Sequence, residues 1–90
     1  MEITEKYKLL NHLGFHLRAI AKFVSVCSRF KCNVSVKGQH HQVDGKSPIG
    51  LLTLAAGQGT ELTVTFEGED AWVARDAVQN LFLNKFGEME

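Results

Sequence analysis

The sequence predicts an α+β fold, a two-layer open-faced sandwich of order βαββαβα in which three helices cover one face of a four-stranded antiparallel sheet. Two patterns support this prediction. Stretches with an apolar period of two alternate with stretches of period 3.6, and the strands keep polar residues at every other position. One sheet face is therefore expected to meet water, and the helices have to cover the other. With 90 residues the chain can bury one modest core, and residues 1–90 are expected to form a single domain.

The strands are predicted from alternation between apolar and polar side chains. In the last of them, Leu62, Val64 and Phe66 alternate with threonines, which is the most regular pattern in the chain. Gly38 and Gln39 are expected at the tip of a hairpin, with a short return strand after it. The four strands are expected at residues 3–10, 32–37, 40–43 and 61–67.

Each predicted helix has an apolar stripe or a recognisable start. Four apolar residues from Ile20 to Cys27 recur at i, i+3, i+4 and i+7 in the first helix. The second begins after Ser47, a preferred N-cap residue, with Pro48 at the first helical position. Apolar residues between Ala74 and Phe82 mark one face of the third. The helices are expected at residues 17–29, 48–56 and 71–86.

Composition excludes several classes of function. The formal net charge is zero, so the chain lacks the basic field that attracts nucleic acid or an anionic membrane. The charged N-terminal residues do not form a signal peptide, and no apolar run is long enough to span a bilayer. We therefore expect a cytoplasmic protein that neither binds nucleic acid nor inserts into a membrane. Cys27 and Cys32 are expected as buried free thiols, because each lies in an apolar pattern without C-x-x-C spacing.

The stretch from Asn11 to Val24 carries the strongest chemical signal. A turn leads into a helix that has His16 and Arg18 at its start. The N–H groups of a first helical turn lack internal partners and carry partial positive charge, so they attract phosphate. A neutral imidazole is a nucleophile, and a guanidinium binds phosphate oxygens. These residues alone leave two interpretations open: a phosphoryl-binding site, or a histidine that only caps the helix beside a solvated arginine.

Four segments carry a resemblance that extends along nearly the whole chain. They are Gly14-Phe15-His16-Leu17-Arg18-Ala19-Ile20-Ala21, Gly45-Lys46-Ser47, Gly57-Gln58-Gly59-Thr60-Glu61-Leu62 and Gly68-Glu69-Asp70. In order and spacing they resemble the HPr phosphocarrier family of the bacterial phosphoenolpyruvate-dependent phosphotransferase system. The resemblance implies the fold predicted above. It also implies a monomeric phosphoryl carrier that is not an enzyme and uses no cofactor.

The resemblance further implies the roles of individual residues. His16 occupies the position that takes a phosphoryl group on Nδ1 from phosphorylated enzyme I and passes it to IIA-type acceptors. Arg18 occupies the position of the arginine that neutralises the phosphate. Ser47 occupies the regulatory position that HPr kinase/phosphorylase modifies in some bacteria, although its use as an N-cap would also explain it. Leu17 replaces the family's usual small residue and Ala19 its usual proline; we expect these departures to affect transfer rate and partner choice.

The second predicted helix is apolar almost all round, so its residues cannot all face one core. By the family's pattern, Ile49 and Leu52 are expected in an exposed partner-binding patch near His16, together with Leu17 and Ala21. The alternative is a helix that is simply well buried.

The remaining histidines and the single tryptophan have no implied role. His12, His40 and His41 match no metal-ligand spacing, so we expect surface histidines and no metal site. Trp72 lies off the main apolar stripe of the last helix and is expected to serve packing.

Three functions can be compared on these observations. The first is the phosphoryl carrier. The second is a regulatory relative whose phosphorylation signals to enzymes or transcription regulators without sugar transport. The third, a small hydrolase, is disfavoured because the sequence places no second carboxylate or cysteine near His16.

Overall fold

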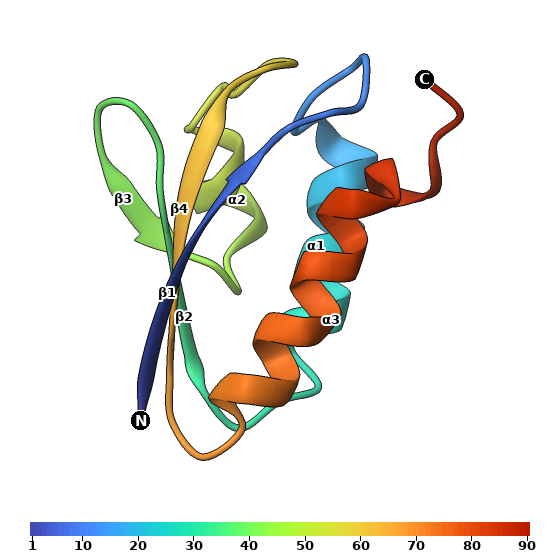
Figure 1. The fold of residues 1–90 in the computed structure, drawn as a ribbon. Coiled ribbons are helices and arrows are strands. Elements are labelled where there is room, and N and C mark those ends of the chain that lie inside the picture. The colour runs from blue at the N-terminus through green and yellow to red at the C-terminus, as the bar shows by residue number, and fades with distance from the viewer.

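One four-stranded antiparallel sheet, with helices on one side, makes up the computed structural model, which describes all residues from Met1 to Glu90 (Figure 1). The elements along the chain are β1 (Glu2–Lys8), α1 (Leu17–Cys27), β2 (Asn33–Lys37), β3 (Gln42–Asp44), α2 (Pro48–Leu52), β4 (Glu61–Glu67), α3 (Ala71–Leu83) and a 3₁₀ turn, η1 (Lys85–Gly87). The strands follow the spatial order β1-β4-β2-β3, with antiparallel pairing throughout. The predicted fold class is confirmed.

The central strand β4 shows why the sheet has one dry face. Leu62, Val64 and Phe66 are fully buried on the side of the helices, whereas the threonines between them are only partly covered. The register pairs Tyr7 of β1 with Leu62, and Val36 of β2 with Val64, so buried residues of neighbouring strands lie side by side. The alternation of apolar and polar residues along the strands therefore places the apolar side chains together on one face of the sheet.

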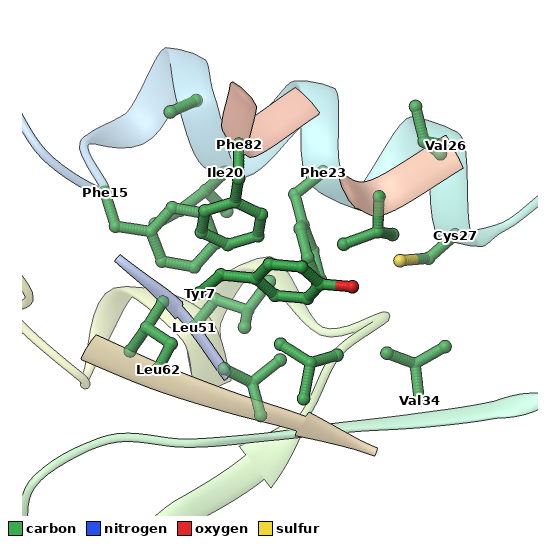
Figure 2. Close-up of a cluster of buried hydrophobic side chains, with 14 of the residues drawn as sticks. Tyr7, Phe15, Ile20, Phe23, Val26, Cys27, Val34, Leu51, Leu62 and Phe82 are labelled. Atoms are coloured by element: carbon green, nitrogen blue, oxygen red, sulfur yellow. The ribbon is translucent and has the colours of Figure 1, made fainter. Parts of the chain in front are cut away.

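Aromatic rings join the helices to this layer (Figure 2). The ring of Tyr7 stacks on that of Phe82 in α3, with centroids 4.7 Å apart, and Phe23 of α1 meets Phe82 edge to face at 6.3 Å. Burial raises the pKa of Tyr7 to about 12, and the nearby carboxylate of Glu5 adds to this effect. The strand, the first helix and the last helix thus share one cluster.

The ends of several elements differ from the prediction. Helix α1 stops at Cys27 rather than residue 29, and α2 stops at Leu52 rather than residue 56. Ala55 has a positive φ of 48°, which no α-helix permits. The resulting turn lets the Ala56 carbonyl accept a hydrogen bond from Phe15 N–H at 2.9 Å. Tertiary pairing with the loop before α1 therefore outweighs the helical propensity of residues 53–56.

The strand ends shift by one to two residues. β1 ends at Lys8 rather than residue 10, β2 begins at Asn33 rather than 32, and β3 covers Gln42–Asp44 rather than 40–43. Pairing continues irregularly at Leu9, which bonds to Thr60 and Gly59 through its backbone and is fully buried. The alternation therefore predicted the buried positions better than the limits of regular pairing.

Helix α3 ends at Leu83 rather than residue 86, because the chain reverses there. Lys85 and Phe86 have positive φ values of 57° and 56°, and Gly87 follows with 78°. Such angles are unfavourable for residues with a Cβ atom, so a compensating contact is required. Phe86 provides it: its side chain is 1% exposed and packs on Phe82, with ring centroids 5.1 Å apart, and on Phe15 at 5.9 Å.

Two predictions about single residue types have different outcomes. Cys27 and Cys32 are free and buried as predicted, and burial raises the pKa of Cys27 to about 12. The prediction that Trp72 serves packing holds only at the surface, because the residue does not belong to the core. Its side chain is half exposed and lies under the guanidinium of Arg75, 4.9 Å from the ring centroid. None of the helices has the length and apolar character needed to cross a membrane.

We expect Phe86→Ala to lower the free energy of unfolding by about 3–5 kcal/mol, because it removes a fully buried ring that supports a reversed backbone. Urea unfolding followed by circular dichroism measures this loss. Leu83→Ala is the matched control: Leu83 lies in the last turn of α3 but is 65% exposed, so its loss should stay within about 0.5 kcal/mol. Similar losses in both variants would contradict the anchoring role of Phe86.

Candidate functional site

His16 stands at the N-cap of α1, in extended backbone conformation with φ −81° and ψ 177°. Its side chain makes no capping hydrogen bond, so the interpretation that it merely caps the helix is not supported. Gly14 sets the approach to this position. It has a φ of 65°, and a Cβ atom there would lie 2.7 Å from the Ala56 carbonyl oxygen. The glycine therefore lets the loop before α1 pack closely against the segment after α2.

The ring of His16 is held by a residue from the other end of the chain. Its Nε2 atom lies 2.5 Å from Oε2 of Glu88, and both side chains are mostly buried, at 24% and 15% exposed. The second carboxylate oxygen of Glu88 accepts a hydrogen bond of 2.9 Å from Nδ2 of Asn11. Asn11 is fully buried and also donates to the Gly14 carbonyl at 2.7 Å. Three side chains thus form a continuous hydrogen-bonded chain that ends on His16.

The electrostatics of this chain fix the role of each ring nitrogen. Burial opposes ionisation of Glu88, but the hydrogen bonds from His16 and Asn11 and the charges of His16 and Lys22 together lower its pKa. An ionised carboxylate can only accept hydrogen bonds, so Nε2 of His16 has to carry the proton. In the neutral ring the free lone pair is then on Nδ1.

The tail reaches His16 because several backbone groups hold it. After η1 the chain continues past the end of α3 to a C-terminus at the same end of the molecule as the loop before α1, as the red end of the ribbon shows (Figure 1). Lys22 Nζ donates to the Phe86 carbonyl at 2.6 Å, and the His12 backbone N–H donates to the Glu90 carbonyl. Helix α1 and the loop before it therefore bind the tail on the two sides of Glu88.

Arg18 lies in the first turn of α1, exposed to solvent and without an ion pair. The backbone N–H groups at this helix start have no carbonyl within the helix to bond to. A shallow hollow beside them, here called the His16 hollow, contains this guanidinium and no carboxylate. The His16 hollow is lined by Leu13, His16, Leu17, Arg18 and Ala21.

Ser47 is the N-cap of α2, as the sequence predicts. Its Oγ accepts a hydrogen bond of 3.1 Å from the Gly50 N–H, and Pro48 occupies the first helical position. The side chain is partly exposed. Capping is therefore an established task of Ser47 in this structure, whatever else it does.

Helix α2 is not fully buried. Leu51 points into the core, whereas Ile49 is 78% and Leu52 52% exposed. Leu17, 67% exposed, and the exposed Ala21 lie at the start of α1, and α1 packs against α2. The residues predicted as a partner-binding patch are therefore all at the surface, on two neighbouring helices.

Sequence reasoning missed three residues of this site. Leu13 is 61% exposed and lines the His16 hollow, and Asn11 and Glu88 form the hydrogen-bonded chain behind the ring. Asparagine three residues before a glycine is a local turn signal that points to a structural role for Asn11. Nothing local signals Glu88, which is 72 residues from His16 in sequence. The expectation that no carboxylate lies near His16 is corrected by this contact.

Comparison with known proteins shows the class to which this fold, with a histidine at the start of its first helix, belongs. Residues 3–84 match the family described as PTS HPr component phosphorylation site. The phosphocarrier protein HPr of Xylella fastidiosa is 42% identical over 86 residues, covering 96% of this chain and 97% of the relative. That of Pseudomonas aeruginosa is 44% identical over 91 residues, covering 100% of this chain and 97% of the relative.

Solved structures agree with these matches. The crystal structure of HPr-C-His from Thermoanaerobacter tengcongensis superposes with a TM-score of 0.89 at 32% identity, covering 100% of this chain and 99% of the other. The chain therefore belongs to the HPr family of the phosphotransferase system. Members of this family are phosphocarriers and not enzymes, which confirms that expectation.

We expect His16→Ala to raise the pKa of Glu88 towards its ordinary value of 4.5, because the variant removes a hydrogen bond and a charge that favour the carboxylate. Carbon-13 NMR titration of the Glu88 carboxyl measures this pKa. Since the folded-state pKa is the lower one, this interaction stabilises the protein above pH 4.5 and is lost as the pH falls through the folded value. His12→Ala, which changes a nearby exposed ring without side-chain bonds to Glu88, should leave that pKa unchanged.

Proposed function

We propose that this protein accepts a phosphoryl group on Nδ1 of His16 from a phosphorylated histidine of enzyme I and passes it to IIA-type acceptors. One observation carries the proposal: Glu88 occupies Nε2, which leaves the Nδ1 lone pair as the nucleophile of the ring. In the first transfer this lone pair forms a bond to phosphorus while the P–N bond to the donor histidine breaks. The electron pair of that bond returns to the donor ring, which is protonated on its other nitrogen and so leaves as a neutral imidazole. Phosphorylated His16 keeps its Nε2 proton, so atoms and charges balance.

Charge neutralisation and positioning supply the catalysis of such a transfer. We assign the first role to Arg18, whose guanidinium lines the His16 hollow without an ion pair of its own. The N–H groups of the first turn of α1 and the helix dipole add to it. Ala19 retains an N–H in this turn that a proline would lack, so the donor set here is one larger than the family's usual pattern provides.

The exposed residues Leu17, Ala21, Ile49 and Leu52 form the proposed docking surface for enzyme I and IIA-type proteins. Apolar side chains at the centre of a protein interface are typically ringed by polar groups, and here they adjoin Arg18 and His16 on α1. Transfer requires the two histidines to meet, so a docking surface beside His16 is where a partner has to bind. Chemical-shift mapping with an added IIA protein checks this surface; shifts confined to the opposite sheet face would contradict it.

Ser47 is the proposed site of regulatory phosphorylation by an HPr kinase/phosphorylase. A phosphate at this N-cap would be stabilised by the N-terminus of α2, so it should not unfold the helix. It would place negative charge two residues from Ile49 in the docking surface and repel an acidic partner. Absence of phosphoserine after incubation with lysate of the host and ATP would count against this role there.

We expect purified protein incubated with phosphoenolpyruvate and enzyme I to take up label that is acid-labile and base-stable, the behaviour of phosphohistidine. His16→Ala should abolish this label and His12→Ala should not. Phosphorus-31 and nitrogen-15 NMR of the labelled protein assign the modified nitrogen. Labelling that persists in His16→Ala would contradict the proposal, and added IIA proteins distinguish an onward carrier from a signalling protein.

We expect Arg18→Ala to slow transfer at saturating enzyme I by roughly 100-fold, the lower end of the range for losing one preorganised group that stabilises developing charge. Stopped-flow or rapid-quench measurement of phosphoryl transfer gives the rate, and titration calorimetry gives partner affinity. Arg29→Ala, which removes an exposed arginine after the end of α1, is the matched control and should keep the original rate. An unchanged rate in Arg18→Ala would refute the assignment.

A further inference from the structure

The C-terminal tail carries a carboxylate directly to the ring of His16, and this contact is built rather than incidental. Glu88 uses both oxygens, one for His16 at 2.5 Å and one for the buried Asn11 at 2.9 Å. Its side chain is only 15% exposed although it lies two positions from the last residue of the chain. A carboxylate with two directed hydrogen bonds has a fixed orientation, so it fixes the ring that it binds.

Two hollows beside His16 differ in the charges that line them. The His16 hollow contains Arg18 and no carboxylate. A second hollow, here called the tail hollow, contains Glu88 and Glu90 but not His16. Arg18 lines both hollows, but only the tail hollow adds the carboxylates of Glu88 and Glu90, so an anionic phosphoryl group is more favourable in the His16 hollow. The tail hollow is lined by His12, Leu13, Arg18, Glu88, Met89 and Glu90.

We propose that Glu88 is a positioning residue for phosphoryl transfer, which holds the Nε2–H edge of His16 so that Nδ1 is unprotonated and directed to the His16 hollow. The proposal rests on the role of His16 as the phosphoacceptor. Asn11 supports it indirectly, because its amide holds the second oxygen of Glu88 and ties it to the Gly14 turn. Glu88 itself does not touch the phosphoryl group.

The same contact serves both directions of the relay. When Nδ1 bonds to phosphorus, the Nε2–H bond to Glu88 is retained, so the ring need not rotate or exchange a proton with water. When the phosphoryl group leaves, the P–N bond breaks and its electron pair returns to Nδ1, while the Nε2 proton stays in place. Acceptance and donation therefore start from one ring orientation.

The architecture of the tail supports this role over a passive one. Three consecutive left-handed residues, 85–87, turn the chain back, and the buried ring of Phe86 anchors the turn. Lys22 holds the Phe86 carbonyl just before Glu88, and His12 holds the Glu90 carbonyl just after it. A tail in which Glu88 had no role would not require backbone contacts on both sides of this carboxylate.

The test compares Glu88→Ala with Glu90→Ala, the same substitution two residues further along the same tail, where the exposed side chain makes no hydrogen bond or ion pair. Nitrogen-15 NMR of the His16 ring measures the proton position in the unphosphorylated protein. We expect Nε2–H with a free Nδ1 in the original protein and in Glu90→Ala, and a mixture of tautomers in Glu88→Ala. Transfer from enzyme I at saturation should be roughly 10-fold slower in Glu88→Ala only. Glu88→Gln, which keeps an acceptor oxygen without the charge, should fall between them.

The outcomes separate this inference from the function it rests on. If the original protein carries phosphate on Nδ1 while Glu88→Ala keeps its tautomer and its rate, the positioning role is wrong and the carrier function stands. A faster rate in Glu88→Ala would show that the tail restrains the histidine and would also overturn the role. If the original protein takes no label on His16, the carrier function itself fails. Circular dichroism spectra of the variants, expected to coincide under the assay conditions, show that slower transfer does not come from lost structure.

Discussion

The burial of Phe86 between Phe15 and Phe82 is the contact on which the functional end of this molecule depends. It joins α3 to the loop before α1, and it offsets the cost of the left-handed backbone at residues 85 and 86. Without that reversal, the residues after α3 would continue away from α1. The position of Glu88 beside His16 is therefore a consequence of apolar packing, although the contact itself is electrostatic.

The site joins two kinds of charge that would otherwise conflict. Phosphoryl chemistry requires positive charge, which Arg18 and the start of α1 provide, yet the only side-chain partner of the His16 ring is an anion. The conflict is resolved by geometry, since the carboxylate binds Nε2, whereas the His16 hollow is lined by Arg18 and by no acidic residue. Each edge of the imidazole thereby has one electrostatic environment. In the proposed relay, the ring accepts and releases one anion while it stays bound to another.

The short helix α2 explains how an apolar surface comes to lie beside this site. Residues 48–56 are apolar enough for a longer helix, but the chain leaves the helix after Leu52 to let the Ala56 carbonyl pair with Phe15. One turn and a half of helix can bury Leu51 but cannot also cover Ile49 and Leu52. The same pairing that closes the loop before α1 thus leaves apolar side chains exposed next to it.

Local patterns in the sequence determined most of the fold. Alternation at Leu62, Val64 and Phe66, the cap and proline at the start of α2 and the stripe of α3 each depend on neighbours within a few residues, so the sheet, the three helices and the N-cap role of Ser47 were predictable. The place of His16 and Arg18 at the start of α1 was predictable for the same reason.

Only the tertiary structure decided how the helices end and what holds the histidine. Helix α2 is cut short by a backbone bond to a loop about 40 residues away, and α3 by the burial of one ring among residues from other elements. The contact between Glu88 and His16 spans 72 positions and arises from packing that no local pattern encodes. The sequence by itself thus placed the nucleophile, whereas the fold selected which of its two nitrogens is free.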